Sequence, residues 1–161
     1  LNINNNDTPN ETPVTPPKPK PKPTRPSYNY IGYIEIPSIN IKKGLVDKNS
    51  VYNNVNYNVQ IMKESSYPDV DKGLFILAAH NGTCYNCYFK HLDNIKNNDL
   101  IYVNYKNKKY TYKVTKKYTV NKTGYVSIYR NNDVTSLALV TCTWGTKNKQ
   151  TVVIAELINK E

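Results

Sequence analysis

The sequence predicts an all-β domain, and three observations predict it. The 161 residues include 15 tyrosines, and the body of the chain is rich in valine, isoleucine and threonine. Such residues fit the pleated, half-buried surface of a sheet. Short apolar or alternating runs recur along the body between turn-forming residues, and none reaches the roughly 18 residues that a membrane-spanning helix needs. This length suits one globular domain with a buried core.

The first four expected strands differ in how deeply they are buried. Residues 30–36 alternate and form the first strand, which Pro37 ends because proline lacks a backbone donor. Residues 39–41 and 58–62 are two further short strands. Residues 73–80 are a continuous apolar run with no polar face, which is typical of a central strand buried on both sides.

The second half of the body adds one helix and four strands. The apolar spacing in residues 87–95 predicts a short helix. Residues 100–105 and 109–120 alternate and form a hairpin, and residues 136–142 and 151–157 form a last strand pair. About eight strands with one or two short helices predict a closed or nearly closed β-barrel.

The N-terminal 27 residues are a separate unit. Eight of the ten prolines lie there, and proline alternates with lysine over residues 17–23. Such a pattern forms neither a helix nor a sheet ladder, because proline lacks the donor and the lysines repel one another. We expect a disordered, extended stalk or linker in residues 1–27 and a globular domain in residues 28–161. The chain begins with leucine, and we expect that an N-terminal anchor or signal precedes the stalk in the full-length protein.

The formal charge of +10 raises the question of nucleic-acid binding. The lysines are scattered along alternating strands, and no helix gathers them on one face. Arginine, the preferred reader of bases, occurs only at Arg25 and Arg130. We therefore expect no nucleic-acid partner, and we interpret the basic surface as that of a protein working beside an anionic cell wall or membrane.

Two apolar runs each end on a residue with catalytic chemistry. Cys142 ends the run at residues 136–142, and His80 ends the run at residues 73–80. A thiol and an imidazole are the two groups that thiol nucleophilic catalysis needs, since the imidazole can hold the thiol as thiolate or protonate the leaving group. The plainer alternative is that each residue is simply packed at a strand end, as most cysteines are.

The order of motifs in the body resembles that of the sortases, the cysteine transpeptidases of Gram-positive cell surfaces. The resemblance covers essentially all of residues 30–158. It rests on a histidine directly after a strand, a following helix that ends in an Asn-Asp turn, and a strand ending in Thr-Cys. The matching segments are residues 31–37 (IGYIEIP), 79–82 (AHNG), 89–99 (FKHLDNIKNND) and 139–142 (LVTC).

The resemblance implies an eight-stranded barrel of sortase type at the outer face of the cell membrane, tethered by an anchor in the full-length protein. Its implied substrates are the sorting-signal peptide of a surface protein, with a motif of the LPxTG type, and an amine acceptor from a cell-wall precursor or a pilin. No cofactor or metal is implied. Cys142 matches the nucleophile, His80 the general acid and base, and Thr141 the threonine that precedes the nucleophile.

One departure from the family pattern concerns the oxyanion. Sortases place an arginine at the start of the last strand, and Gln150 stands at that position here. A glutamine amide can donate a hydrogen bond to an oxyanion, but it is neutral and lacks the two-pronged guanidinium fork. We rank Gln150 first as the replacement and Arg130 second, although Arg130 would reach the site only if its loop folds back over it. Lys149 is a further alternative.

A second departure is the pair Cys84 and Cys87, which follows His80 closely. We expect a disulfide or two free thiols there. A zinc site that also uses His80 and Cys142 is the least favoured alternative, because it would block the nucleophile.

The function that the sequence predicts is therefore a cysteine transpeptidase that forms a thioester on Cys142 and passes the acyl chain to an amine. Two alternatives stay open. The missing arginine suggests a catalytically weakened, sortase-like peptide-binding module. The charge and the cysteine pair suggest a zinc-stabilised, basic nucleic-acid-binding barrel.

Overall fold

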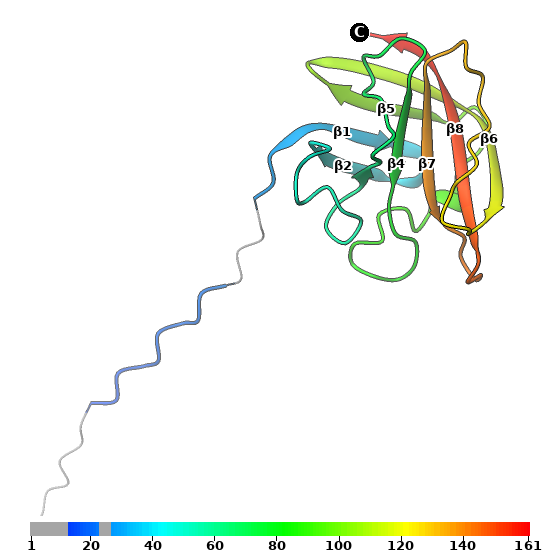
Figure 1. Cartoon of the computed structure of the whole chain (residues 1–161). Helices are drawn as coiled ribbons and strands as arrows, with labels where there is room; N and C mark the ends of the chain where they lie inside the picture. The colour runs from blue at the N-terminus through cyan, green and yellow to red at the C-terminus, as the bar shows by residue number, and fades with distance from the viewer. Residues whose placement is uncertain (1–12, 23–26) are drawn as a thin grey trace, which may run out of the picture.

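The structure is a computed structural model, and it describes residues 13–22 and 27–161. The body is a strongly curved sheet with two short 3-10 helices (Figure 1). The strands are β1 (Tyr30–Ile36), β2 (Ile41–Val46), β3 (Gln60–Ile61), β4 (Leu74–Ala78), β5 (Leu100–Tyr105), β6 (Lys108–Asn121), β7 (Ser136–Cys142) and β8 (Lys149–Lys160). The helices are η1 (Pro37–Ile39) and η2 (Leu92–Asn94).

The eight strands form one sheet in the order β2-β1-β5-β6-β8-β7-β4-β3. Neighbouring strands are antiparallel except β4 and β7, which run parallel. The outermost strands β2 and β3 contact each other, so the sheet curls into a nearly closed barrel. The predicted all-β, eight-stranded barrel is confirmed.

The sheet is buried on both faces around β4 and β7. The inner face carries the main core, in which Leu77 and Leu139 are completely buried. The outer face of the same strands carries a second apolar cluster around Ala138 and Val140. The segment between β6 and β7 covers this cluster with Val126 and Ile128. Burial on both faces is why these strands read as continuous apolar runs rather than alternating ones.

The predicted helix over residues 87–95 is wrong. Only η2 is helical there, and the preceding residues form successive tight turns. The backbone N–H groups of Cys87, Lys90 and Leu92 each donate to the carbonyl three residues earlier, at 3.0–3.2 Å. Phe89, Leu92 and Ile95 are all completely buried, so packing against the core sets the path of this segment. The helical spacing of apolar residues therefore reflects burial and not a regular helix.

Two of the expected short strands also differ. Residues 39–41 are not a strand, because Pro37 starts η1 and Asn40 ends it in the left-handed region at φ 54°. The strand begins at Ile41 and continues to Val46. In the expected strand at residues 58–62, only Gln60 and Ile61 pair with β4.

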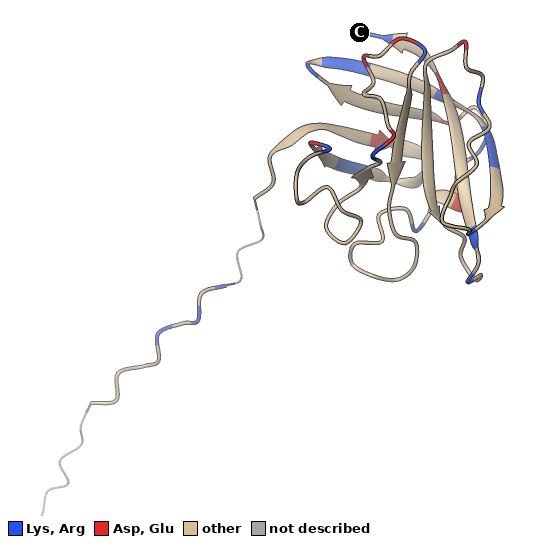
Figure 2. Cartoon of the chain, viewed as in Figure 1, with Lys and Arg blue, Asp and Glu red and all other residues tan. Residues whose placement is uncertain are grey.

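Residues 13–22 have no regular secondary structure and run away from the barrel (Figure 1). The rest of the expected stalk, residues 1–12 and 23–26, lies outside the described residues. Within the described ranges, no helix is long and apolar enough to cross a membrane. Figure 2 shows Lys and Arg on several elements, among them β2, the β5–β6 hairpin and β6, rather than on one.

Candidate active site

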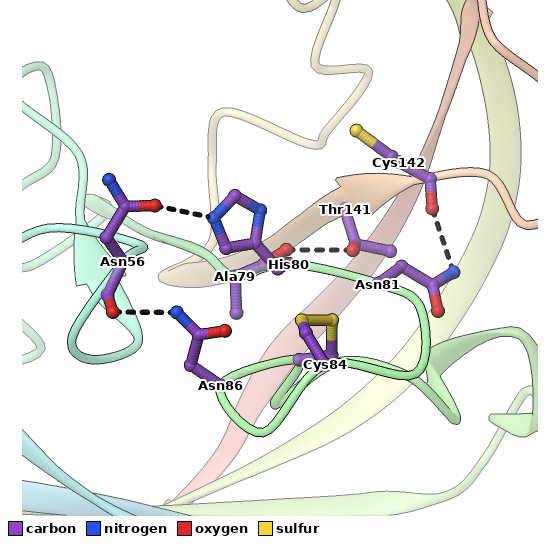
Figure 3. Close-up of a disulfide and its surroundings, with 9 residues drawn as sticks. Asn56, Ala79, His80, Asn81, Cys84, Asn86, Thr141 and Cys142 are labelled. Carbon is purple, nitrogen blue, oxygen red and sulfur yellow. Dashed lines mark hydrogen bonds between the residues drawn. A yellow bond between two sulfur atoms is a disulfide. The ribbon is translucent and has the colours of Figure 1, made fainter.

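The pairing of β4 with β7 brings the two candidate catalytic residues to one edge of the sheet. The strands are parallel and in register, with Ala78 opposite Val140, and the Ala79 N–H donates to the Val140 carbonyl at 3.3 Å. Parallel strands end at the same edge of the sheet. His80 and Cys142, each two positions after the paired residues Ala78 and Val140, therefore lie at that edge (Figure 3). Cys142 has a free, partly exposed thiol, and His80 is half-buried.

His80 is oriented by a residue that sequence reasoning missed. The Oδ1 atom of Asn56 lies 3.1 Å from the His80 Nε2 atom. An amide oxygen only accepts, so this contact is a hydrogen bond when Nε2 carries the proton, which leaves Nδ1 as the basic nitrogen of the neutral ring. Asn86 Nδ2 in turn donates to the Asn56 carbonyl at 2.6 Å and fixes that loop. Figure 3 shows the imidazole between Asn56 and the end of the Cys142 strand.

Two hydrogen bonds tie the end of β7 to the segment that follows β4. Asn81 Nδ2 donates to the Cys142 carbonyl at 2.8 Å. The Thr141 hydroxyl donates to the Ala79 carbonyl, also at 2.8 Å. The Thr141 side chain is only 2% exposed and points to the face opposite Cys142. The geometry thus supports Thr141 as a positioning residue that fixes the spacing of the two strand ends, and not as a side chain that contacts substrate.

Gln150 lies directly beside the candidate nucleophile. It is the register partner of Cys142 across the antiparallel β7–β8 pair. Directly opposed residues of an antiparallel pair project from the same face of the sheet, so the Gln150 amide and the Cys142 thiol share a face. Gln150 is half-buried, which leaves the amide accessible to a ligand.

A groove of about 570 Å³ runs along the outer face of β4 and β7 and reaches Gln150. Its floor is apolar, with Ile76, Ala78 and Val140, and the β6–β7 segment contributes one wall through Val126. A second depression, of about 380 Å³, contains Cys142 itself and is bordered by the β7–β8 loop. The Cys142 thiol therefore opens into the second depression, and its neighbours Val140 and Gln150 line the apolar groove.

A family model described as the sortase domain matches residues 34–158, and this range includes every residue of the site described above. The chain belongs to the sortase family. Sortases are cysteine transpeptidases that act at Gram-positive cell surfaces, and this sortase has the thiol and the imidazole of such an enzyme at adjacent strand ends.

Solved sortase structures have the same fold. Sortase C1 of Streptococcus agalactiae is 30% identical, with a TM-score of 0.68 over 81% of this chain and 68% of that one. Sortase C of Clostridium perfringens is 27% identical, with a TM-score of 0.67 over 81% and 71%. Sortase A of Listeria monocytogenes is 24% identical, with a TM-score of 0.68 over 82% and 89%, a similarity that concerns the fold alone. No curated protein matched this sortase in a search of such proteins.

Arg130, the second-ranked oxyanion candidate, makes its hydrogen bonds at the start of β7, whereas Cys142 lies at the end of that strand. Its guanidinium donates to the carbonyls of Lys72 at 3.1 Å, Gly73 at 3.3 Å and Val134 at 3.0 Å. These residues precede β4 and β7, whereas Cys142 ends β7. A strand of seven residues spans roughly 20 Å at about 3.3 Å per residue. The β6–β7 loop borders the groove with Val126, but its Arg130 is held at the far end of β7, and this placement contradicts a role for Arg130 at the oxyanion.

We expect Arg130→Ala to lower stability and to leave catalysis intact. The substitution removes a charged donor from three partly exposed backbone carbonyls, and those of Gly73 and Val134 keep a second donor, so a loss of about 1 kcal/mol is expected. Thermal unfolding should show a lower Tm, while turnover of the sorting peptide at a temperature below both transitions should match that of the unmodified sortase. A lost turnover at unchanged Tm would contradict this assignment.

We expect Asn56→Ala to lower turnover about tenfold, which is part of the roughly 10²–10⁴-fold contribution of general acid–base catalysis. The ring keeps its place on the strand end but loses the partner that orients it. Asn56→Asp is the informative second variant, because a carboxylate oxygen can accept the same hydrogen bond from Nε2. Turnover in that variant should exceed that of Asn56→Ala. An unchanged rate in Asn56→Ala, or equal losses in both variants, would rule out the positioning role.

Cys84 and Cys87 form a disulfide in the loop between His80 and η2, with their Cα atoms 5.1 Å apart (Figure 3). The loop is also held by the Phe89 N–H, which donates to the His80 carbonyl at 3.1 Å. Thiols joined in a disulfide supply no thiolate ligands, so this pair does not support the zinc alternative. No three metal-ligating side chains gather anywhere in residues 13–22 and 27–161.

Reduction of this disulfide should leave the barrel folded. The bond closes a loop of only a few residues, and the entropic stabilisation from so short a loop is about 2 kcal/mol or less. We expect a Tm lower by a few degrees and a change in turnover of less than about tenfold, since the loop carries His80 at only one of its ends. Mass spectrometry after alkylation checks the starting state, in which one thiol and not three should react.

Proposed function

We propose that this sortase is an active transpeptidase that cleaves a C-terminal sorting motif of the LPxTG type. The observation that carries the proposal is the in-register parallel pairing of β4 and β7. This pairing brings His80 and Cys142 to one edge of the sheet, beside an apolar groove. Leucine and proline of such a motif are apolar, and the floor of the groove offers apolar side chains to them.

The reaction has two steps. The Cys142 thiolate attacks the carbonyl carbon of the scissile Thr–Gly bond, and His80 gives its proton to the departing glycine amine. The peptide bond breaks and a thioester forms on Cys142. An amine then attacks the thioester, His80 takes the proton of that amine, and the Cys142 thiolate leaves as a new amide bond forms. One amide is exchanged for another, so no oxidant, reductant or cofactor takes part.

Gln150 is the proposed side-chain donor to the oxyanion in both steps. The proposal is supported by the register pairing of Gln150 with Cys142, which puts the two side chains on the same face of the sheet. A neutral amide donor is weaker than an arginine, because hydrogen bonds from charged donors are roughly twice as strong. This difference is what favours the second candidate function, a weakened sortase that binds sorting peptides and turns them over slowly or not at all.

The acceptor is the amine that attacks the Cys142 thioester in the second step. The structure of a sortase C from Streptococcus pneumoniae is described in terms of its pilin substrate specificity. For this sortase we propose an amine of a cell-wall precursor or of a pilin as the acceptor. We also propose a location at the outer face of the cell membrane, with residues 1–27 as the stalk and residues 28–161 as the catalytic domain.

The test uses the full chain, a panel of peptides with LPxTG-type motifs, and hydroxylamine as a strong amine nucleophile. We expect a covalent acyl adduct on Cys142 by intact-mass spectrometry, and its release as the hydroxamate when hydroxylamine is added. Peptides that bind, measured by calorimetry, but give neither adduct nor product would establish the binding module in place of the enzyme. Peptides that neither bind nor react would reject the LPxTG-type motif.

A further inference from the structure

A cluster of exposed and half-buried tyrosines beside the active site takes no part in the proposed reaction. It surrounds a pocket of about 350 Å³ between the start of β1, β2 and the loops that precede β3 and follow β4. We call it the tyrosine pocket, and the aromatic residues that line it are Tyr28, Tyr30, Tyr57, Tyr85 and Tyr88. Figure 1 places the two loops side by side at one end of the barrel.

Most of the tyrosine pocket is exposed aromatic surface, whereas Tyr28 and Tyr88 are half-buried and Tyr88 packs against the core. Tyr30 and Tyr57 are each 49% exposed, and Tyr85 is 82% exposed. The rings are held by one another: Tyr28 lies 6.0 Å from Tyr30 and 5.0 Å from Tyr52, and Tyr52 lies 5.8 Å from Tyr57, as centroid distances. Contiguous aromatic surface of this kind marks a binding site, because the apolar faces of the rings gain free energy when a ligand removes them from water.

The polar groups of the tyrosine pocket are amides and one cation. Asn56 and Asn86 line it, and the Asn86 side chain is fixed by its bond to the Asn56 carbonyl. The Lys43 ammonium lies 4.9 Å from the Tyr88 centroid and donates to the Tyr30 hydroxyl at 3.2 Å. No Asp or Glu is among the described residues that line the pocket. This chemistry suits a neutral or anionic ligand that carries amide or hydroxyl groups, and it disfavours a cationic one.

We propose that the tyrosine pocket binds an N-acetylated glycan. Tyrosine faces pack against the apolar C–H faces of sugar rings, and the amides of Asn56 and Asn86 pair with hydroxyl and acetamido groups. The ammonium of Lys43 adds a donor without adding repulsion. The pocket adjoins the catalytic centre through Asn56, which also contacts His80. This binding site goes beyond the proposed reaction and does not depend on it.

A proline-rich peptide is the other ligand that aromatic grooves bind, in the polyproline II conformation. The chain itself carries such a segment, but Lys18, Lys20 and Lys22 would bring three cations to a pocket that holds Lys43 and no described acidic residue. The charges of the pocket therefore favour the glycan.

The experiment titrates chitotetraose, an oligomer of N-acetylglucosamine, into the isotope-labelled full chain and follows backbone amide signals by NMR. Chitotetraose has no amine, so no acyl transfer interferes, and failure of the proposed reaction leaves this measurement unaffected. We expect shifts at Asn56, Tyr57, Tyr85 and Asn86. Tyr57→Ala and Tyr85→Ala should each weaken binding about three- to tenfold, which is the loss of one aromatic contact.

Tyr33→Ala is the matched control. Tyr33 is an exposed tyrosine on β1 with Lys42 5.3 Å from its ring centroid, and it lies outside the tyrosine pocket. Its loss should leave chitotetraose binding unchanged. The proposal is overturned by an absence of shifts at saturating sugar, or by Tyr57→Ala and Tyr85→Ala variants that bind as tightly as Tyr33→Ala. It is also overturned if a peptide of residues 13–22 shifts these signals and the sugar does not.

Discussion

Cys142→Ala should abolish thioester formation and lower peptide turnover by about 10⁴-fold or more, since loss of the nucleophile removes the covalent route entirely. The barrel should stay folded. Cys142 is the last residue of β7 and is partly exposed, so the loss of one sulfur atom opens no enclosed cavity. Intact-mass spectrometry with the sorting peptide and thermal unfolding measure the two effects separately.

The matched control for this prediction is a variant in which Cys84 and Cys87 are both alanine. It removes the other two cysteine sulfur atoms of the chain and leaves the Cys142 thiol free. This variant should still form the acyl adduct. If it loses the adduct and Cys142→Ala keeps it, the nucleophile has been misassigned.

Burial explains why the main strands could be predicted from the sequence. Residues 136–142 and 73–80 read as unbroken apolar runs because their strands are buried on both faces, by the inner core and by the outer cluster around Val140. Their parallel pairing could not be derived from local pattern, because register depends on the whole sheet order. The ends of the two apolar runs singled out His80 and Cys142, and the resemblance to the sortases, not periodicity, assigned their roles.

The parts that the sequence did not predict depend on contacts between distant segments. Asn56 lies in a polar loop 24 positions before His80, and no local signal distinguishes it from the other asparagines of that loop. The segment at residues 87–95 has the spacing of a helix, but a disulfide at its start and the burial of Phe89 impose turns instead. The tyrosine pocket could not be predicted from the tyrosine content either, because composition does not distinguish buried tyrosines such as Tyr110 and Tyr112 from the exposed Tyr85.

Gln150→Ala should lower turnover by about ten- to a thousandfold, which is the range observed when an oxyanion donor is removed. The physical reason is that the amide shares a face with Cys142 and meets charge that develops only in the transition state. The loss should therefore fall on kcat more than on KM, and the Tm should change little because Gln150 is half-buried at a strand end. Steady-state kinetics of the sorting peptide separate the two constants.

Two further substitutions at this position distinguish charge from shape. Gln150→Arg should be tolerated and should raise turnover, because a guanidinium offers a charged, two-pronged donor to the same oxygen. Gln150→Glu keeps the size but presents an anion to the developing oxyanion, so its turnover should fall below that of Gln150→Ala. If all three variants turn over peptide as the unmodified sortase does, the oxyanion is held by backbone N–H groups or by Lys149. In that case the glutamine found where sortases carry arginine has no catalytic role.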